Sequence, residues 1–163
     1  MDYQFDLQRI LNSEVLIDSA GARAIEFTLG YVPDEDVIIV MSVMLIPTER
    51  SDVFELCFGI RAKEIKNRIT VSEPDYSKKA TDLFIPKASR TLVHNLIIEA
   101  TTVLVQSVHC DYITMETFYS HLPAKAMTKY EAICGAVVLG GYELLDQFRN
   151  DDGIDYWSFG KHI

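Results

Sequence analysis

Residues 89–108 read SRTLVHNLIIEATTVLVQSV and give the clearest structural signal in the chain. Apolar side chains recur every three or four positions, from Leu92 and Leu96 to Leu104 and Val108. This spacing gathers them on one wide face of an α-helix, and that face leaves water only by packing against another element. The stretch therefore predicts a long amphipathic helix lying on an apolar surface.

The half of the chain before this helix has mainly the two-residue period of strands. Arg23–Leu29 and Val53–Ile60 alternate apolar and polar residues, while Val37–Ile46 is almost continuously apolar, as in a strand buried on both faces. These three runs predict an antiparallel meander. We also expect a short strand over Leu83–Ile85 and a short amphipathic helix over residues 3–12, where apolar residues recur at helical spacing.

After the long helix, strand and helix patterns alternate. Tyr112–Phe118 is predicted as a strand, residues 124–139 as a second helix, and Tyr142–Phe148 with Ile154–Phe159 as a strand pair joined by a short turn. No repeat or linker divides the sequence. We therefore expect a single α+β domain over residues 1–163, built on a mixed, mostly antiparallel sheet flanked by helices.

Composition excludes several classes of protein. With 163 residues, 48% hydrophobic and 24% charged, the chain is typical of a globular domain rather than a disordered or coiled-coil one. The net charge of -9 argues against binding to duplex nucleic acid, and no apolar run approaches the ~20 residues of a membrane span. Three scattered cysteines, Cys57, Cys110 and Cys134, favour a reducing compartment, so we expect a cytoplasmic location.

Positive charge is concentrated in one segment of this acidic chain. Residues 49–90 hold nine of the 15 lysines and arginines, which indicates either an anion site or an ordinary solvated surface. At the start of the long helix, Lys87 and Arg90 supply charge, and Ser89 and Thr91 supply hydroxyls. A helix N-terminus with such residues suits a pyrophosphate. In the alternative interpretation, Ser89 is a helix cap and both bases are exposed.

The order of elements over about residues 80–160 resembles the GNAT-type N-acetyltransferase superfamily. Its members have an antiparallel meander, a strand, a pyrophosphate loop, a long helix, a strand, a second helix and a final strand pair. The resemblance implies acetyl-CoA as cofactor, held by Lys87, Ser89, Arg90 and Thr91. The family's loop carries glycines, which residues 87–92 lack.

The family also has an Ala on the second helix, followed four residues later by a Tyr that acts as general acid. Ala126 and Tyr130 match this spacing. The resemblance thus implies direct acyl transfer to an amine of a small molecule or protein, with Tyr130 protonating the leaving thiolate. Glu55, Glu73 and Asp82 all remain candidates for the base. Tyr130 is also explained as a core aromatic with its hydroxyl at the rim.

Two further interpretations stay open. A non-catalytic interaction or regulatory protein would use acidic stretches, Asp34–Asp36 and Asp151–Asp152, to bind a basic protein partner. The aromatic run Asp155–Phe159 fits a closing core strand, and its alternative role is a homodimer interface. No metal site is predicted, because the histidines and cysteines lack the close paired spacing of metal ligands.

Overall fold

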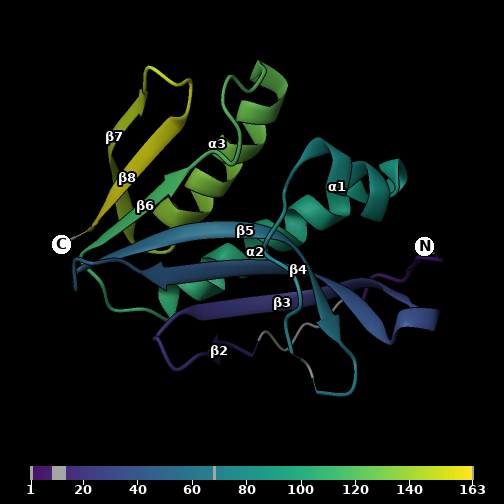
Figure 1. Ribbon diagram of the computed structural model, residues 1–163. Coiled ribbons are helices and arrows are strands. Elements are labelled where there is room, and N and C mark those ends of the chain that lie inside the picture. The colour runs from purple at the N-terminus through teal and green to yellow at the C-terminus, as the bar shows by residue number, and fades with distance from the viewer. Residues whose placement is uncertain (1, 9–13, 68, 163) are drawn as a thin grey trace.

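The computed structural model describes residues 2–8, 14–67 and 69–162. The elements in chain order are β1 (Gln4–Phe5), β2 (Leu16–Ile17), β3 (Arg23–Val32), β4 (Val37–Pro47), β5 (Val53–Glu64), α1 (Lys78–Phe84), α2 (Arg90–Gln106), β6 (Tyr112–Glu116), α3 (Ala124–Leu139), β7 (Tyr142–Arg149) and β8 (Asp155–Lys161), with short 3-10 turns at Pro33–Glu35 and Lys87–Ser89. The predicted α+β class is confirmed in the described residues, where one mixed sheet carries three α-helices (Figure 1).

The strands form one sheet in the order β1-β3-β4-β5-β6-β8-β7, with β2 pairing beside β1 on β3. The predicted meander is confirmed as β3-β4-β5, and the predicted final strand pair as the antiparallel β7-β8. Among the pairs of named strands described, β5 with β6 alone is parallel. The chain therefore needs a crossover between these two strands, and α2 lies in it.

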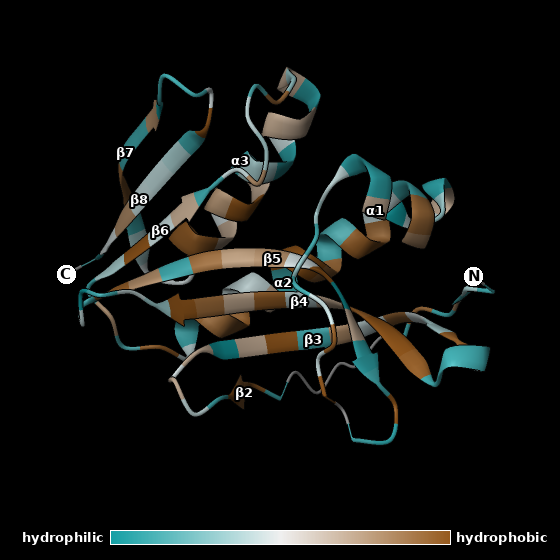
Figure 2. Ribbon diagram, viewed as in Figure 1, coloured by the Kyte–Doolittle hydropathy of each residue, from teal (hydrophilic) through white to brown (hydrophobic). Residues whose placement is uncertain are grey.

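The core lies between the sheet and the two long helices. The predicted helix over residues 89–108 is confirmed as α2, which packs on β3, β4 and α3. Figure 2 shows the apolar residues concentrated along the central strands. Met41, Leu45, Ile97 and Phe159 are fully buried. Residues 39–45 are buried throughout, which confirms the expectation that this strand has two covered faces.

The predicted strand at Leu83–Ile85 is wrong, because these residues end helix α1. The Ser77 hydroxyl caps this helix by accepting a hydrogen bond from the Ala80 amide at 3.0 Å. Lys78 and Asp82, one turn apart, form an ion pair. A cap and an i,i+4 pair outweigh an apolar run of three residues, which by itself fits either a strand or a helix.

The predicted helix over residues 3–12 is also wrong in the part that the structure describes, and residues 9–12 lie outside the described residues. Gln4 and Phe5 form β1, paired with Tyr31 and Gly30. A Cβ on Gly30 would lie 2.2 Å from the Gln4 carbonyl oxygen, so only glycine permits this close approach. The pairing uses the two-residue alternation of this segment rather than its helical spacing.

The two parallel strands separate soon after they meet. β5 and β6 are paired only over residues 53–56 and 112–115. Beyond that point β5 pairs instead with the chain that follows it, through the bridges Ile60 with Asp75 and Lys63 with Thr70. Figure 1 shows β5 and β6 starting side by side and diverging toward α1 and α3. The sheet is therefore closed at one end of this pair and open at the other.

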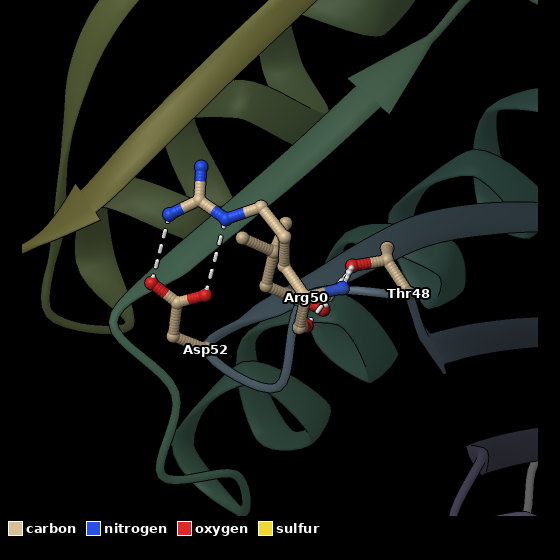
Figure 3. A network of polar contacts seen from close by, with 4 residues as sticks. Thr48, Arg50 and Asp52 are labelled. Carbon is tan, nitrogen blue, oxygen red and sulfur yellow. Dashed lines mark hydrogen bonds and ion pairs between the residues drawn. The ribbon is translucent and has the colours of Figure 1, made fainter.

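A polar network holds the closed end together at the turn between β4 and β5 (Figure 3). The Thr48 hydroxyl bonds the Val53 carbonyl at 2.9 Å, and Arg50 bonds the Asp52 carboxylate through Nε and a terminal nitrogen. The Asp52 carbonyl accepts the Tyr112 amide at 3.0 Å, and the Arg50 guanidinium lies 5.8 Å from the Tyr112 ring centre. This turn therefore fixes the start of β6 beside the start of β5.

Candidate functional site

A cavity of about 600 Å³ opens where β5 and β6 separate. It lies between α1 and the N-terminal halves of α2 and α3. The residues that line it are Phe58, Tyr76, Ser77, Lys78, Lys79, Thr81, Asp82, Arg90, Phe118, Tyr119, Leu122, Pro123, Lys125, Ala126, Lys129, Tyr130 and Ile133. The volume is within the usual range for small-molecule sites.

Packed aromatic rings form the inner wall of this cavity. The Tyr130 ring lies parallel to that of Trp157 at 5.7 Å and meets Phe58 at 5.6 Å, while Tyr76 meets Phe58 edge-on at 4.8 Å. Because Phe58 and Tyr130 are each only 5% exposed, this wall is set rigidly by the core. Edge-on and stacked contacts of this kind stabilise a defined ring geometry.

The inner wall carries two phenolic hydroxyls, those of Tyr76 and Tyr130, and the Tyr130 hydroxyl lies beside the chain that leaves β6. It accepts a hydrogen bond from the Phe118 amide at 3.2 Å, at the point where the chain leaves β6. Burial raises the pKa of Tyr130, and the Phe118 hydrogen bond opposes that rise in part. The phenol is therefore neutral near pH 7, and its own proton remains available for donation into the cavity.

Five cationic side chains and one carboxylate line the rim: Lys78, Lys79, Arg90, Lys125, Lys129 and Asp82. Arg90 and Lys78 both bind Asp82, which lies 2.8 Å from Arg90. The hydrogen bond from Lys78 and the charge of Arg90 hold the pKa of Asp82 below its usual range. Within the described residues, Lys79, Lys125 and Lys129 form no ion pair. A chain of net charge -9 thus presents a locally positive cavity.

Both long helices begin at this rim without a side-chain cap. Pro123 precedes α3 and Ser89 precedes α2, and neither side chain caps its helix. The first amides of a helix have no partner inside the helix, and they carry the positive end of its dipole. At the start of α2, the amides of Ser89 and Arg90 are bonded within the preceding 3-10 turn, to the carbonyls of Pro86 and Lys87. The helix start that lines the cavity is therefore that of α3, and its field adds to that of the cationic side chains and favours an anion.

The structure brings only part of the predicted site together. Arg90 and Tyr130 line the same cavity. Lys87, Ser89 and Thr91 lie at the start of α2 but do not line the cavity. The side chains of Lys87 and Thr91 are exposed to solvent. The turn Lys87–Ser89 continues the helix backward by one 3-10 turn, and Lys87 in it is exposed.

Sequence reasoning missed the second half of the cationic rim. Lys125 and Lys129 lie four residues apart in the first two turns of α3, and both line the cavity. Their spacing was the available signal, since residues at i and i+4 share one face of a helix. Phe118 and Tyr119 were also missed. The expected strand ran to Phe118, whereas β6 ends at Glu116, and no local pattern links the residues that follow to Tyr130.

The three carboxylates considered as a base lie in different environments. Asp82 is held ionised by Lys78 and Arg90. Glu73 is exposed in the segment before α1. Glu55 is half-buried on β5, opposite Thr114 and next to the last residue pair before β5 and β6 separate. Burial, and then the charge of Glu116, raise the pKa of Glu55.

No group of three or more His, Cys, Asp or Glu side chains among the described residues is arranged to hold a metal ion. His94 on α2 has a buried Nδ1 that finds no hydrogen-bond partner among the residues that the structure describes. Burial lowers the pKa of His94, and the nearby charge of Lys129 lowers it further. His94 therefore lies close enough to Lys129 for that charge to disfavour the protonated imidazole.

None of the helices in the described ranges is long and apolar enough to cross a membrane. Comparisons of the chain with protein-family models, with curated proteins and with solved structures found no match.

Proposed function

We propose that the chain is an acyl-CoA-dependent N-acyltransferase-like protein, whose acyl donor occupies the cavity between β5, β6, α1 and α3. One observation carries this proposal. A cationic rim surrounds an aromatic cavity, in which the buried Tyr130 keeps a proton to donate. Acyl-CoA matches this arrangement, because its phosphates are anionic and its thioester, once cleaved, requires a proton.

The sequence of elements in the second half supports the same proposal. A meander is followed by α2, β6, α3 and a final strand pair, as in the GNAT-type superfamily that the sequence resembles. The chain between β5 and α2 differs, since it is long, contains α1 and lacks loop glycines. In this proposal Arg90, Lys125 and Lys129 bind the phosphates through side chains, where a glycine loop would use backbone amides.

The proposed reaction is a direct transfer. The nitrogen of an amine attacks the thioester carbonyl carbon, the carbon–sulfur bond breaks, and an amide forms. The proton of the attacking amine passes to solvent water, because Asp82, the carboxylate that lines the cavity, is held ionised by Lys78 and Arg90, and Glu55 and Glu73 do not line it. Tyr130 gives its proton to the departing sulfur and regains one from solvent.

Isothermal titration of CoA and acetyl-CoA into the protein tests the proposal. We expect binding that weakens about tenfold or more in Lys125→Ala/Lys129→Ala, since hydrogen bonds to charged groups contribute ~1.5–3 kcal/mol each. Lys66→Ala is the matched control, because Lys66 is an exposed lysine outside the cavity. Absence of binding by the unaltered protein at millimolar CoA would reject the proposed function.

Turnover is a separate test of Tyr130. With a panel of amines as acceptors, release of free thiol from acetyl-CoA should fall strongly in Tyr130→Phe. This variant keeps the ring that packs on Phe58 and Trp157 and loses only the hydroxyl. CoA affinity should change little, so a parallel loss of affinity would argue against a role in proton transfer.

A further inference from the structure

The cavity has a second apolar wall, formed by Phe118, Tyr119 and Leu122 in the chain between β6 and α3. Phe118 is 46% exposed and Tyr119 is 47% exposed, with their rings edge-on at 4.9 Å. Of the large apolar side chains that are exposed in the described residues, these two line the cavity. They are therefore available for contact with a ligand there, whereas the inner wall is already packed.

This outer wall is directly attached to the proposed proton donor. The amide of Phe118 donates to the Tyr130 hydroxyl. The side chain of the same residue is therefore attached next to the proposed position of the leaving sulfur. Leu122 and Pro123 continue the wall to the start of α3. The acyl chain of the thioester would thus lie near this apolar, half-exposed wall.

An acetyl group offers this wall a single methyl. The cavity holds about 600 Å³, and its positive charges lie on α1 and on the helix starts, while the wall between β6 and α3 is apolar. A ligand that fits both parts carries an anionic end and a substantial apolar end. Exposed aromatic side chains beside a charged rim are a common feature of sites for such ligands.

We infer that the acyl group carried into this cavity is larger and more apolar than acetyl, such as a medium-length aliphatic chain or an arylacetyl group packed against Phe118, Tyr119 and Leu122. This inference rests on the proposed function, because it takes the thioester of CoA as the ligand. It adds the class of acyl donor, which the resemblance does not supply.

The expected preference follows from the area that the wall covers. Each methylene removed from water contributes about fourfold in affinity, so four further carbons of which two or three are covered give about tenfold or more. Free CoA and acetyl-CoA should bind with similar affinity, since both share the phosphates. Hexanoyl-CoA and phenylacetyl-CoA represent the aliphatic and aromatic groups.

The experiment is titration calorimetry of CoA, acetyl-CoA, hexanoyl-CoA and phenylacetyl-CoA against the full chain. We expect at least one of the two larger thioesters to bind about tenfold more tightly than acetyl-CoA, and the one that does identifies the kind of acyl group. Equal affinity for all four ligands would overturn the inference and leave the proposed function standing. No binding of any of them would overturn both.

Variants locate the preference on the wall. Phe118→Ala/Tyr119→Ala removes two exposed rings and keeps the backbone amide that bonds Tyr130, so the fold should persist and CoA affinity should stay within about twofold. The preference for the larger thioester should fall to about threefold or less. Phe148→Ala is the matched control, because this ring on β7 is 52% exposed outside the cavity. A preference that survives in the double variant would contradict the assignment.

Discussion

The two ends of the β5–β6 pair differ in what occupies them. At the closed end, the turn between β4 and β5 satisfies its own polar groups, and the Asp52 carbonyl holds the start of β6. At the open end, the same strands separate around a cavity lined by half-exposed aromatic rings and by three lysines that form no ion pair within residues 2–8, 14–67 and 69–162. The polar groups of the closed end, by contrast, have partners in the chain. The first arrangement stabilises the fold, and the second is suited to a ligand.

This contrast explains why one parallel pair matters in an otherwise antiparallel sheet. A parallel neighbour must return by a crossover, which brings the start of α2 to the end where β5 finishes. The next helix, α3, begins beside it after β6. Arg90 of α2 and the first turn of α3 therefore lie at the open end. Ligands of α/β proteins commonly bind at the carboxyl ends of strands for this reason.

The largest expected effect is on stability at the last paired position. Leu56 is 1% exposed and opposes Met115, so Leu56→Ala should lower the free energy of unfolding by about 2–5 kcal/mol. Phe118→Ala, at the open rim, should change it by less than about 1 kcal/mol. Urea denaturation measures both values. Similar losses in the two variants would mean that the open wall is part of the core.

The polar turn of the closed end should contribute less than Leu56 to the free energy of unfolding. Thr48→Val removes the hydroxyl that bonds the Val53 carbonyl and retains the side-chain shape, so we expect a loss of about 1 kcal/mol. CoA affinity should be unaffected, because Thr48 lies outside the cavity. Thermal denaturation and CoA titration of the same preparation check the two halves of this prediction. A weakened CoA affinity would contradict the proposal that the closed end stabilises the fold without taking part in ligand binding.

A pH-dependent effect is expected at Glu55. Its pKa is raised above the ordinary 4.5 by burial and by the charge of Glu116, so the folded chain binds this proton more tightly than the unfolded chain. The resulting stabilisation is present below that ordinary pKa and is lost as the pH rises through the raised pKa. Glu55→Gln should therefore be more stable than the unaltered protein near pH 7, with the difference vanishing near pH 4. Melting curves across this range measure it, and a variant less stable at pH 7 would contradict the sign.

The smallest expected effect is a change in the titration of one histidine. Burial lowers the pKa of His94, and Lys129 lowers it further, so Lys129→Gln should raise that pKa toward its ordinary value. Bound CoA should act in the same direction by placing negative charge near Lys129. NMR titration of the imidazole protons follows both changes. A His94 pKa that is insensitive to the variant and to CoA would place the anion elsewhere.

Much of the fold was predictable because its strongest patterns are local. The period of α2 and the apolar run of β4 gave their elements almost to the residue. The strand expected at Leu83–Ile85 failed because the cap at Ser77 and the ion pair of Lys78 with Asp82 favour a helix. β1 was missed because its partner lies on β3, far along the chain.

The candidate site was less predictable, since its parts come from distant segments. Arg90 and Tyr130 carried recognisable local signals and do line one cavity. The separation of β5 from β6 depends on pairing between β5 and the chain after it, through contacts such as Ile60 with Asp75. No periodicity in the sequence indicates where such a pairing ends. The position of Phe118 in the cavity wall depends on that same separation of the strands, so the sequence did not indicate it.

Hydrogen exchange with and without CoA compares both ends of the strand pair in one experiment. If the open end binds the ligand, CoA slows exchange of the amides in residues 76–90 and 117–130, which surround that end, and leaves residues 48–56 and 111–115 unchanged. Slowed exchange confined to the closed end, or no change anywhere at saturating CoA, would contradict ligand binding at the open end.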